Sequence, residues 1–411
     1  MSLMDCGESF LKMFIQLDLH IDMKRLLVGF TIALCMIFSA NRAFAAEKNP
    51  ADTNAFNPGS LIIEHVIDSY GWHITGEGEK SVAIPLPVIL IDNGLHVFMS
   101  NKFEHGHHVY KGYALGFTEE HKGKIVKLGG KYSDYTGSWE QIYKDECIAQ
   151  NDEKALSKLI DEKATGKMID ISITKNVCSL FISIILILFI FLRVAKQYKQ
   201  RENEAPRGLQ GLMEPIILFI RDEVAIPSLG KTRYQKYLPY LLTLFFFILI
   251  NNLMGLIPIF PGGANLTGNI AVTGVLALIT FLITSFSADA NYWKHLINTP
   301  GVPWFLKIPI PLMPLVEIIG IFTKPFVLMV RLFANITAGH IIALGVISLI
   351  FIFGGMSVGL GYGVSIVSLI FYVFMGLLEC IVAFIQAFVF TLLTAMFTGM
   401  AMPAEHAVEH K

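Results

Sequence analysis

The sequence has few charged residues for its length, and the charges nearly cancel. Of 411 residues, 16% are Asp, Glu, Lys or Arg, 54% are hydrophobic, and the formal net charge is −1. This balance gives no basis for nucleic-acid binding, and the mean hydropathy of +0.56 is too high for an ordinary soluble protein. The sequence contains neither a Gly-rich phosphate loop nor a His-Glu-x-x-His zinc motif, so no cofactor or metal chemistry is predicted. These features indicate a membrane protein with several spans.

The first residues are typical of an export signal. Lys24 and Arg25 precede a short apolar run, and the small-residue motif Ala43-Phe44-Ala45 follows it. We therefore expect residues 1–45 to be a cleaved signal peptide, with Met23 as an alternative start. An uncleaved membrane anchor is the other interpretation. Both place the next segment on the exported side.

Cysteines are scarce in the exported segment, residues 46–170. It is polar and rich in Gly, His, Tyr and Lys, and only Cys147 of the five cysteines lies in it, so no internal disulfide is available. We expect a small α+β or irregular periplasmic domain, with a short strand pair within residues 84–90 and a charged helix over 151–164.

Three histidines in this segment, His105, His107 and His108, lie close together. They either bind a metal or remain in solvent, and no Cys or carboxylate spacing supports a metal site.

The membrane domain, residues 171–411, begins with a span at 174–192. Five basic residues follow it, namely Arg193, Lys196, Lys199, Arg201 and Arg207. The positive-inside rule places this loop in the cytoplasm. Residues 208–226 mix apolar and charged positions, which predicts an amphipathic helix at the cytoplasmic surface. Further crossings are expected at 238–257 and 269–287.

Two apolar segments near 314–351 and 361–398 are too long for upright spans. Each has about 38 residues and would be about 57 Å long as a helix, whereas the hydrocarbon layer is about 30 Å thick. The helices must therefore tilt strongly or break. No proline follows Pro325 in either segment, which favours continuous tilted helices. The sequence thus predicts an all-α polytopic membrane protein with five crossings, its N-terminus periplasmic and its C-terminus cytoplasmic in a bacterial inner membrane.

Ionisable side chains are rare in the last two spans. From residue 316 to 402 the acidic, basic and histidine residues are Glu317, Lys324, Arg331, His340 and Glu379. An Arg at the centre of a membrane helix costs about 2.5–3.5 kcal/mol on insertion scales and usually marks an ion pathway. Helical geometry puts Arg331 and His340 on opposite sides of one helix. If the hairpin turns near residues 354–355, His340 and Glu379 lie at comparable distances from the turn.

The motifs around these residues resemble those of subunit a of the F-type ATP synthase, over about residues 170 to 402. They are Lys324-Pro325, Arg331-Leu332-Phe333-Ala334-Asn335, Ala338-Gly339-His340 and Gln386-Ala387-Phe388-Val389-Phe390. The resemblance implies a membrane stator with no active site of its own. It would conduct protons through two offset half-channels. Its implied partners are the c-ring, b-type peripheral stalk subunits and the lipid bilayer.

The resemblance also implies roles for individual residues. Proton translocation is expected to involve Arg331, Glu317, Asn335, His340, Glu379 and Gln386, and the candidate half-channel lining residues are Asn252, Asn269 and Lys324. His340 and Glu379 would serve the periplasmic path, in the exchanged order seen in mitochondrial-type members. Where the family often has Asp-x-Asn-x-Thr, this chain has Asn269-Ile270-Ala271-Val272-Thr273, which leaves that entrance uncharged.

Other interpretations stay open at this point. A proton-coupled secondary transporter would usually show two repeated halves with interrupted helices, and no such repeat is visible. An exported binding module on a membrane anchor would leave Arg331 unexplained. The ionisable side chains could also be buried ion pairs that only orient helices.

Overall fold

The computed structural model describes residues 68–75, 82–116, 121, 123–146, 156–200, 205–257, 262–289, 292–293 and 312–402. All of them belong to one compact unit, Asn57–Lys411. The expected signal peptide, Cys147 and the C-terminal residues after 402 lie outside the described residues.

Five of the described helices are long and apolar enough to cross a membrane, which confirms the predicted helical fold. They are α7 (Lys175–Gln200), α10 (Tyr234–Leu256), α11 (Ile270–Ser287), α13 (Leu312–Met356) and α14 (Val358–Ala401). Between α7 and α10 lies a helical segment formed by α8 (Leu209–Phe219), a π-helical stretch (Ile220–Ala225) and α9 (Ile226–Leu229). It covers the predicted amphipathic helix.

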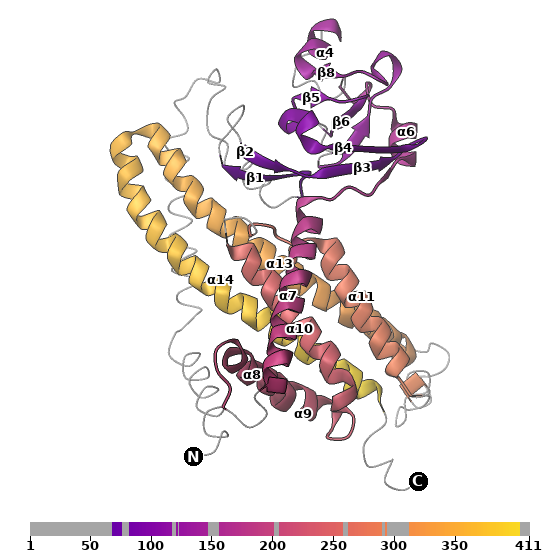
Figure 1. The fold of residues 1–411 in the computed structure, drawn as a ribbon, viewed down its shortest axis with the longest axis vertical. Helices are drawn as coiled ribbons and strands as arrows, with labels where there is room; N and C mark the ends of the chain where they lie inside the picture. Colours follow the sequence, from indigo (N-terminus) through magenta and orange to yellow (C-terminus); the bar gives the residue numbers. More distant parts are fainter. Residues whose placement is uncertain are drawn as a thin grey trace. The chain divides into compact units, whose positions relative to one another are not determined.

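Helices α13 and α14 lie side by side as an antiparallel hairpin (Figure 1). They have 45 and 44 residues, and Pro325 lies inside α13 without ending it. The turn is at Ser357, whose hydroxyl accepts a hydrogen bond from the Leu360 backbone N–H at 3.3 Å. At 1.5 Å per residue each helix is about 66 Å long, roughly twice the hydrocarbon thickness. The prediction of continuous helices is correct, and their length requires a strong tilt in a bilayer.

Helix α10 is the centre of the membrane core. Its side chains Phe245, Phe246 and Ile248 are almost fully buried, and they belong to one apolar cluster with residues of α13 and α14. On α14, Thr391, Thr394 and Thr398 are also buried, and each hydroxyl donates to the carbonyl four residues earlier at 2.8 Å. Small or internally satisfied side chains let membrane helices approach closely. This packing determines which faces of α13 and α14 remain exposed.

The N-terminal segment, residues 46–170, forms small antiparallel sheets and short helices in its described part. Its strands are β1 (Gly71–Thr75), β2 (Val82–Pro85), β3 (Pro87–Ile91), β4 (Leu95–Met99), β5 (His108–Val109), β6 (Tyr113–Leu115), β7 (Ile125–Lys127), β8 (Gly137–Ser138) and β9 (Ile169–Asp170). Its α-helices include α4 (Trp139–Glu146) and α6 (Glu162–Lys167). The largest sheet has the order β4-β3-β9, with Val88 and Leu90 of β3 fully buried beneath it. An α+β arrangement was predicted here.

Two details of the predicted secondary structure were wrong. Strands β2 and β3 do occupy residues 84–90, but β2 pairs with β1 and β3 with β4. Only Leu86 separates β2 from β3, which is too little chain for a hairpin turn. The charged helix expected over 151–164 is interrupted, because Ile160 is buried and bridges to Leu128. Asp161 then starts the short helix α6 by accepting hydrogen bonds from two backbone N–H groups.

A buried carboxylate joins three strands of this segment. Asp92, 8% exposed, follows β3, accepts a hydrogen bond from the Tyr113 hydroxyl at 3.1 Å and forms an ion pair with Lys127 of β7. The hydrogen bond from Lys127 lowers the pKa of Asp92, and this effect outweighs burial, which would raise it. Removing one partner of such a pair leaves a desolvated charge.

We therefore expect Lys127→Met to destabilise the β3, β6 and β7 region by about 2 kcal/mol, less than for a fully buried pair because Lys127 is partly exposed. Hydrogen exchange of the full chain at neutral pH would measure this as faster exchange in these strands. Lys124→Met, at an exposed lysine of the same segment, is the matched control. Equal exchange in the two variants would contradict the prediction.

The same ion pair has a defined pH dependence. Because the folded-state pKa of Asp92 is lowered, the stabilisation is present above the ordinary Asp pKa of about 3.9 and is lost as the pH falls through the folded value. The difference in exchange between wild type and Lys127→Met should therefore persist at neutral pH and disappear under strongly acidic conditions. A difference that stays constant with pH would contradict this assignment.

Candidate functional site

Arg331 lies on the exposed face of α13. Exposed residues on this face recur at helical spacing, and they are Val327, Val330, Arg331, Ala334, Asn335, Ala338, Ile341 and Ile342. Leu328 and Leu332, on a neighbouring face, are buried in the core. The structure records no ion pair between Arg331 and any side chain that it describes. Asn335 is one turn away on the same face, as predicted.

His340 and Glu379 lie on the side of the hairpin that faces inward. A β-carbon at Gly339 would lie 2.7 Å from Glu379 Oε1, and one at Gly255 of α10 would lie 3.5 Å from His340 Nε2. Glu379 thus lies against Gly339, the residue that precedes His340 in the sequence. Glu379 Oε1 is buried with no hydrogen-bond partner in the described part of the chain. The glycine at 339 provides the space in which this carboxylate sits.

Asn252 of α10 links two other elements to this side. It is 2% exposed, donates from Nδ2 to the Ala383 carbonyl of α14 at 3.3 Å, and accepts at Oδ1 from the Thr267 hydroxyl at 2.6 Å. Gly255, which contacts His340, is one turn further along the same helix. Buried amides of this kind commonly hold membrane helices together. Asn252 is therefore placed between α10, α14 and the loop before α11.

Gln386 is buried one turn beyond Ala383, on the face of α14 that packs against α10. Because Gly339 is level with Glu379 in the antiparallel hairpin, Arg331 is at about the level of residue 387. Gln386 thus lies at the height of Arg331 but on the inner face. Asn269 is half-buried and caps α11, where its side chain accepts from the Ala271 N–H at 2.9 Å.

Lys324 lies at the other end of α13, toward the C-terminus of α14. Its Nζ is 5.2 Å from the centre of the Phe397 ring, and it lines a small cleft with Thr280, Thr284 and Tyr292. Glu317 lies within α13, but its side chain is outside the described residues.

Hydroxyl groups gather at this same end, and no sequence pattern predicts them. Their pairs are Tyr237 with Ser287 at 2.9 Å, Tyr240 with Thr280 at 3.1 Å and Thr284 with Thr398 at 3.4 Å. They come from α10, α11 and α14, so only the packing of three helices brings them together. Hydroxyls both donate and accept hydrogen bonds, as a water-filled proton path requires.

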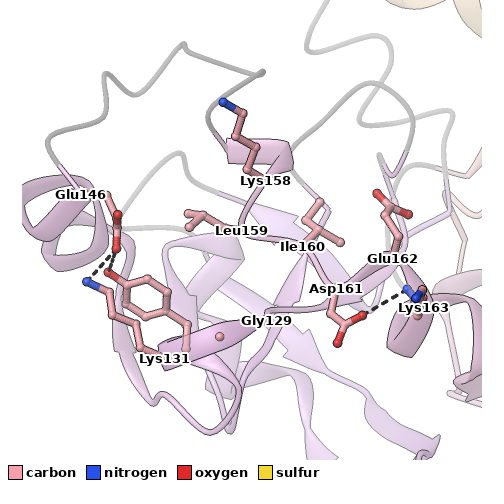
Figure 2. Close-up of a pocket in the computed structure, with 11 residues that line it drawn as sticks. Gly129, Lys131, Glu146, Lys158, Leu159, Ile160, Asp161, Glu162 and Lys163 are labelled. Atoms are coloured by element: carbon pink, nitrogen blue, oxygen red, sulfur yellow. Dashed lines mark hydrogen bonds and ion pairs between the residues drawn. The ribbon is translucent and has the colours of Figure 1, made fainter.

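The N-terminal segment, residues 46–170, contains a cleft of about 700 Å³ between α4 and α6 (Figure 2). Of its three lysines, Lys131, Lys158 and Lys163, Lys131 is already paired with Glu146 at 2.6 Å, and that hydrogen bond lowers the pKa of Glu146. Nearby, His108 Nε2 lies 3.4 Å from Glu104 Oε2. Among the described residues, no group of three His, Cys, Asp or Glu side chains is arranged to hold a metal.

Comparison with known proteins identifies the membrane domain. The ATP synthase A chain family model matches residues 177–399, more than half of the chain. The chain belongs to the ATP synthase subunit a family. A second model, Domain of unknown function (DUF8433), matches residues 61–157 within the N-terminal segment.

Several relatives share the membrane domain. ATP synthase subunit a of Chloroherpeton thalassium is 44% identical over 242 residues, 57% of this chain and 68% of the relative. ATP synthase subunit a 2 of Chlorobaculum tepidum is 46% identical over 237 residues, 56% of this chain and 63% of the relative. ATP synthase subunit a of Myxococcus xanthus is 41% identical over 246 residues, 57% of this chain and 75% of the relative.

Membership of the subunit a family sets the general function. The chain is a non-catalytic, proton-conducting stator subunit of the membrane sector of ATP synthase, Fo. The multi-pass membrane location follows from the same family and from the five apolar helices.

The close approach of Gly339 to Glu379 leads to a prediction. In Gly339→Ala the new methyl group would meet Oε1 at 2.7 Å, so the Glu379 carboxylate must move away from its place against residue 339. We expect slower ATP-driven proton pumping in inverted membrane vesicles, with the protein still present at normal levels.

Gly345→Ala is the matched control, because it makes the same exchange in the same helix with no atom within 4 Å of the new methyl group. Both substitutions raise helix propensity equally, by about 1 kcal/mol. Equal pumping by the two variants would show that the position of Glu379 is unimportant.

Proposed function

We propose that Arg331 faces the carboxylates of a rotating c-ring and prevents a direct proton leak between two half-channels. The supporting observation is its place: a permanent charge on the exposed face of a membrane helix, with no ion pair among the described side chains. A guanidinium stays protonated even where an ammonium would lose its charge. It lowers the pKa of an approaching carboxylate and keeps that acid ionised while it passes.

The surroundings of Arg331 suit a moving partner. The exposed positions Ala334 and Ala338 have small side chains, which let another helix approach closely. Asn335 is close enough along the helix to offer a competing hydrogen bond to a carboxylate. Gln386, at the same height on the inner face, is proposed to do so from α14 after a change of side-chain conformation. Such competition keeps the attraction from becoming a permanent ion pair.

We propose that the two half-channels lie at opposite ends of α13 relative to Arg331. His340, Glu379 and Asn252 form the periplasmic path, with Asn269 near its entrance. A histidine beside a carboxylate can transfer protons near neutral pH at low energetic cost. The cytoplasmic path is lined by Lys324, Glu317 and the hydroxyl pairs of α10, α11 and α14. Arg331 lies between the two sets in sequence and along the helix.

The membrane topology and the partner subunits are proposed on the same basis. The chain spans a bacterial inner membrane, with residues 46–170 periplasmic after removal of the signal peptide and the C-terminus cytoplasmic. Its partners are the c-ring and b-type peripheral stalk subunits. Family membership favours this stator over a proton-coupled secondary transporter.

The decisive variant is Arg331→Ala in the assembled ATP synthase. We expect it to abolish ATP-driven proton pumping in inverted vesicles and to permit passive proton leakage, because nothing then keeps the two paths apart. Passive leakage is measured as proton uptake driven by a potassium diffusion potential without ATP.

Arg193→Ala is the control, since it removes a cation near the end of α7 that is outside the proposed path. It should leave coupled pumping unchanged. Normal coupled pumping by Arg331→Ala would refute the proposed role of this residue.

A further inference from the structure

The outer face of the β4-β3-β9 sheet is entirely apolar. On β4, Leu95, Val97 and Met99 are 68%, 60% and 42% exposed, and on β9 and just after it Ile169 and Ile171 are 57% and 56% exposed. The pairing Ile91 with Leu95, Ile89 with Val97, and Ile91 with Ile169 places these side chains on one surface. We call this surface, residues 89, 91, 95, 97, 99, 169 and 171, the outer sheet face.

Such a face is unusual for a sheet in water. The other side is already covered, since Val88 and Leu90 are buried and Phe98 packs against Phe103 and Tyr110. A two-layered antiparallel sheet normally alternates apolar inner positions with polar outer ones. Here none of the seven outer positions can ionise or donate a side-chain hydrogen bond. Contiguous exposed apolar patches usually mark contact with another protein or with a membrane.

The sheet is firmly connected to the start of the first membrane span. Backbone N–H groups of Ile171 and Ile173 donate to the carbonyls of Ile89 and Pro87, so β9 stays attached to the sheet almost to α7. Asp68 then caps α7 by accepting from the Asn176 N–H at 3.0 Å and the Thr174 hydroxyl at 2.7 Å. No loose linker separates the sheet from the helix.

This connection places the outer sheet face close to lipid. Only three residues lie between Ile171 and Lys175, the first residue of α7, and these four steps along an extended strand span at most about 13 Å. The apolar surface then continues on α7 itself, where Phe181, Ile185 and Leu188 are exposed. The polar headgroup layer on each side of a bilayer is only about 6 Å thick.

We propose that the outer sheet face rests on the outer leaflet of the membrane, with its aliphatic side chains inserted at the boundary between headgroups and acyl chains. The exported segment is thereby an interfacial membrane-binding module as well as an extension of the chain. A lipid surface fits a face without charges or hydrogen-bonding side chains, next to a span whose exposed side is apolar. The inference depends on α7 crossing the membrane, and it does not depend on the proposed role of Arg331.

The test uses the full-length chain without its native cysteines, reconstituted in vesicles of phosphatidylethanolamine and phosphatidylglycerol. A single cysteine, Val97→Cys, carries an environment-sensitive fluorophore, and some lipids carry a nitroxide quencher near the headgroup. We expect a blue-shifted emission that the nitroxide lipids quench. Ile169→Cys on the neighbouring strand should give the same result, which guards against a local disturbance at one position.

Glu140→Cys on α4, an exposed position away from the outer sheet face, is the matched control and should show neither effect. Lipid quenching does not depend on which way the protein is oriented in the vesicle. Labels at 97 and 169 that are quenched no more than the label at 140 would overturn the proposal. If they became protected only in the assembled ATP synthase, a protein partner would cover the face instead of lipid.

Discussion

A permanent positive charge in an apolar setting is the constraint on which the membrane domain depends. Arg331 must lie in a helix long enough to cross the bilayer, yet no described acid of the same chain neutralises it. Its insertion costs about 2.5–3.5 kcal/mol, which the surrounding apolar helix has to offset. Because Leu328 and Leu332 of α13 pack in the same core as Phe245 and Phe246 of α10, the face of α13 that carries Arg331 remains exposed. The site is thus a product of how the other helices bury their side chains.

The same hairpin separates two chemical surroundings. Outward, α13 presents Arg331 and Asn335 among alanine, valine and isoleucine side chains. Inward, Glu379, His340 and Asn252 lie where α10 and α14 meet, and a carboxylate oxygen is buried there without a partner in the described part of the chain. A buried unsatisfied acceptor is costly unless water reaches it. The inner group therefore has the polarity expected of a hydrated path, while the outer one is suited to contact with a partner.

The sequence predicted the helices well because span length and apolar composition are local properties. The apolar segments on both sides of Ser357 are long and contain no proline after Pro325, which favoured continuous tilted helices over broken ones. Contacts between separate helices were harder to predict from the sequence. The level of His340 and Glu379 in the hairpin could be inferred, but the space that Gly339 provides could not, and the hydroxyl pair of Tyr237 with Ser287 required the packing of separate helices. In the N-terminal segment, strands of two to five residues carry too little periodicity to determine their pairing, and burial of Ile160 overrode a strong local helix pattern.

Only Ser357 connects α13 and α14, which have nearly equal lengths, so the two helices cannot shift far along each other. A shift of one helix past the other by a turn would separate Gly339 from Glu379. The hairpin must therefore tilt or shift as a single lever. A sideways force on its outer surface is transmitted to the far end of both helices rather than absorbed where it is applied.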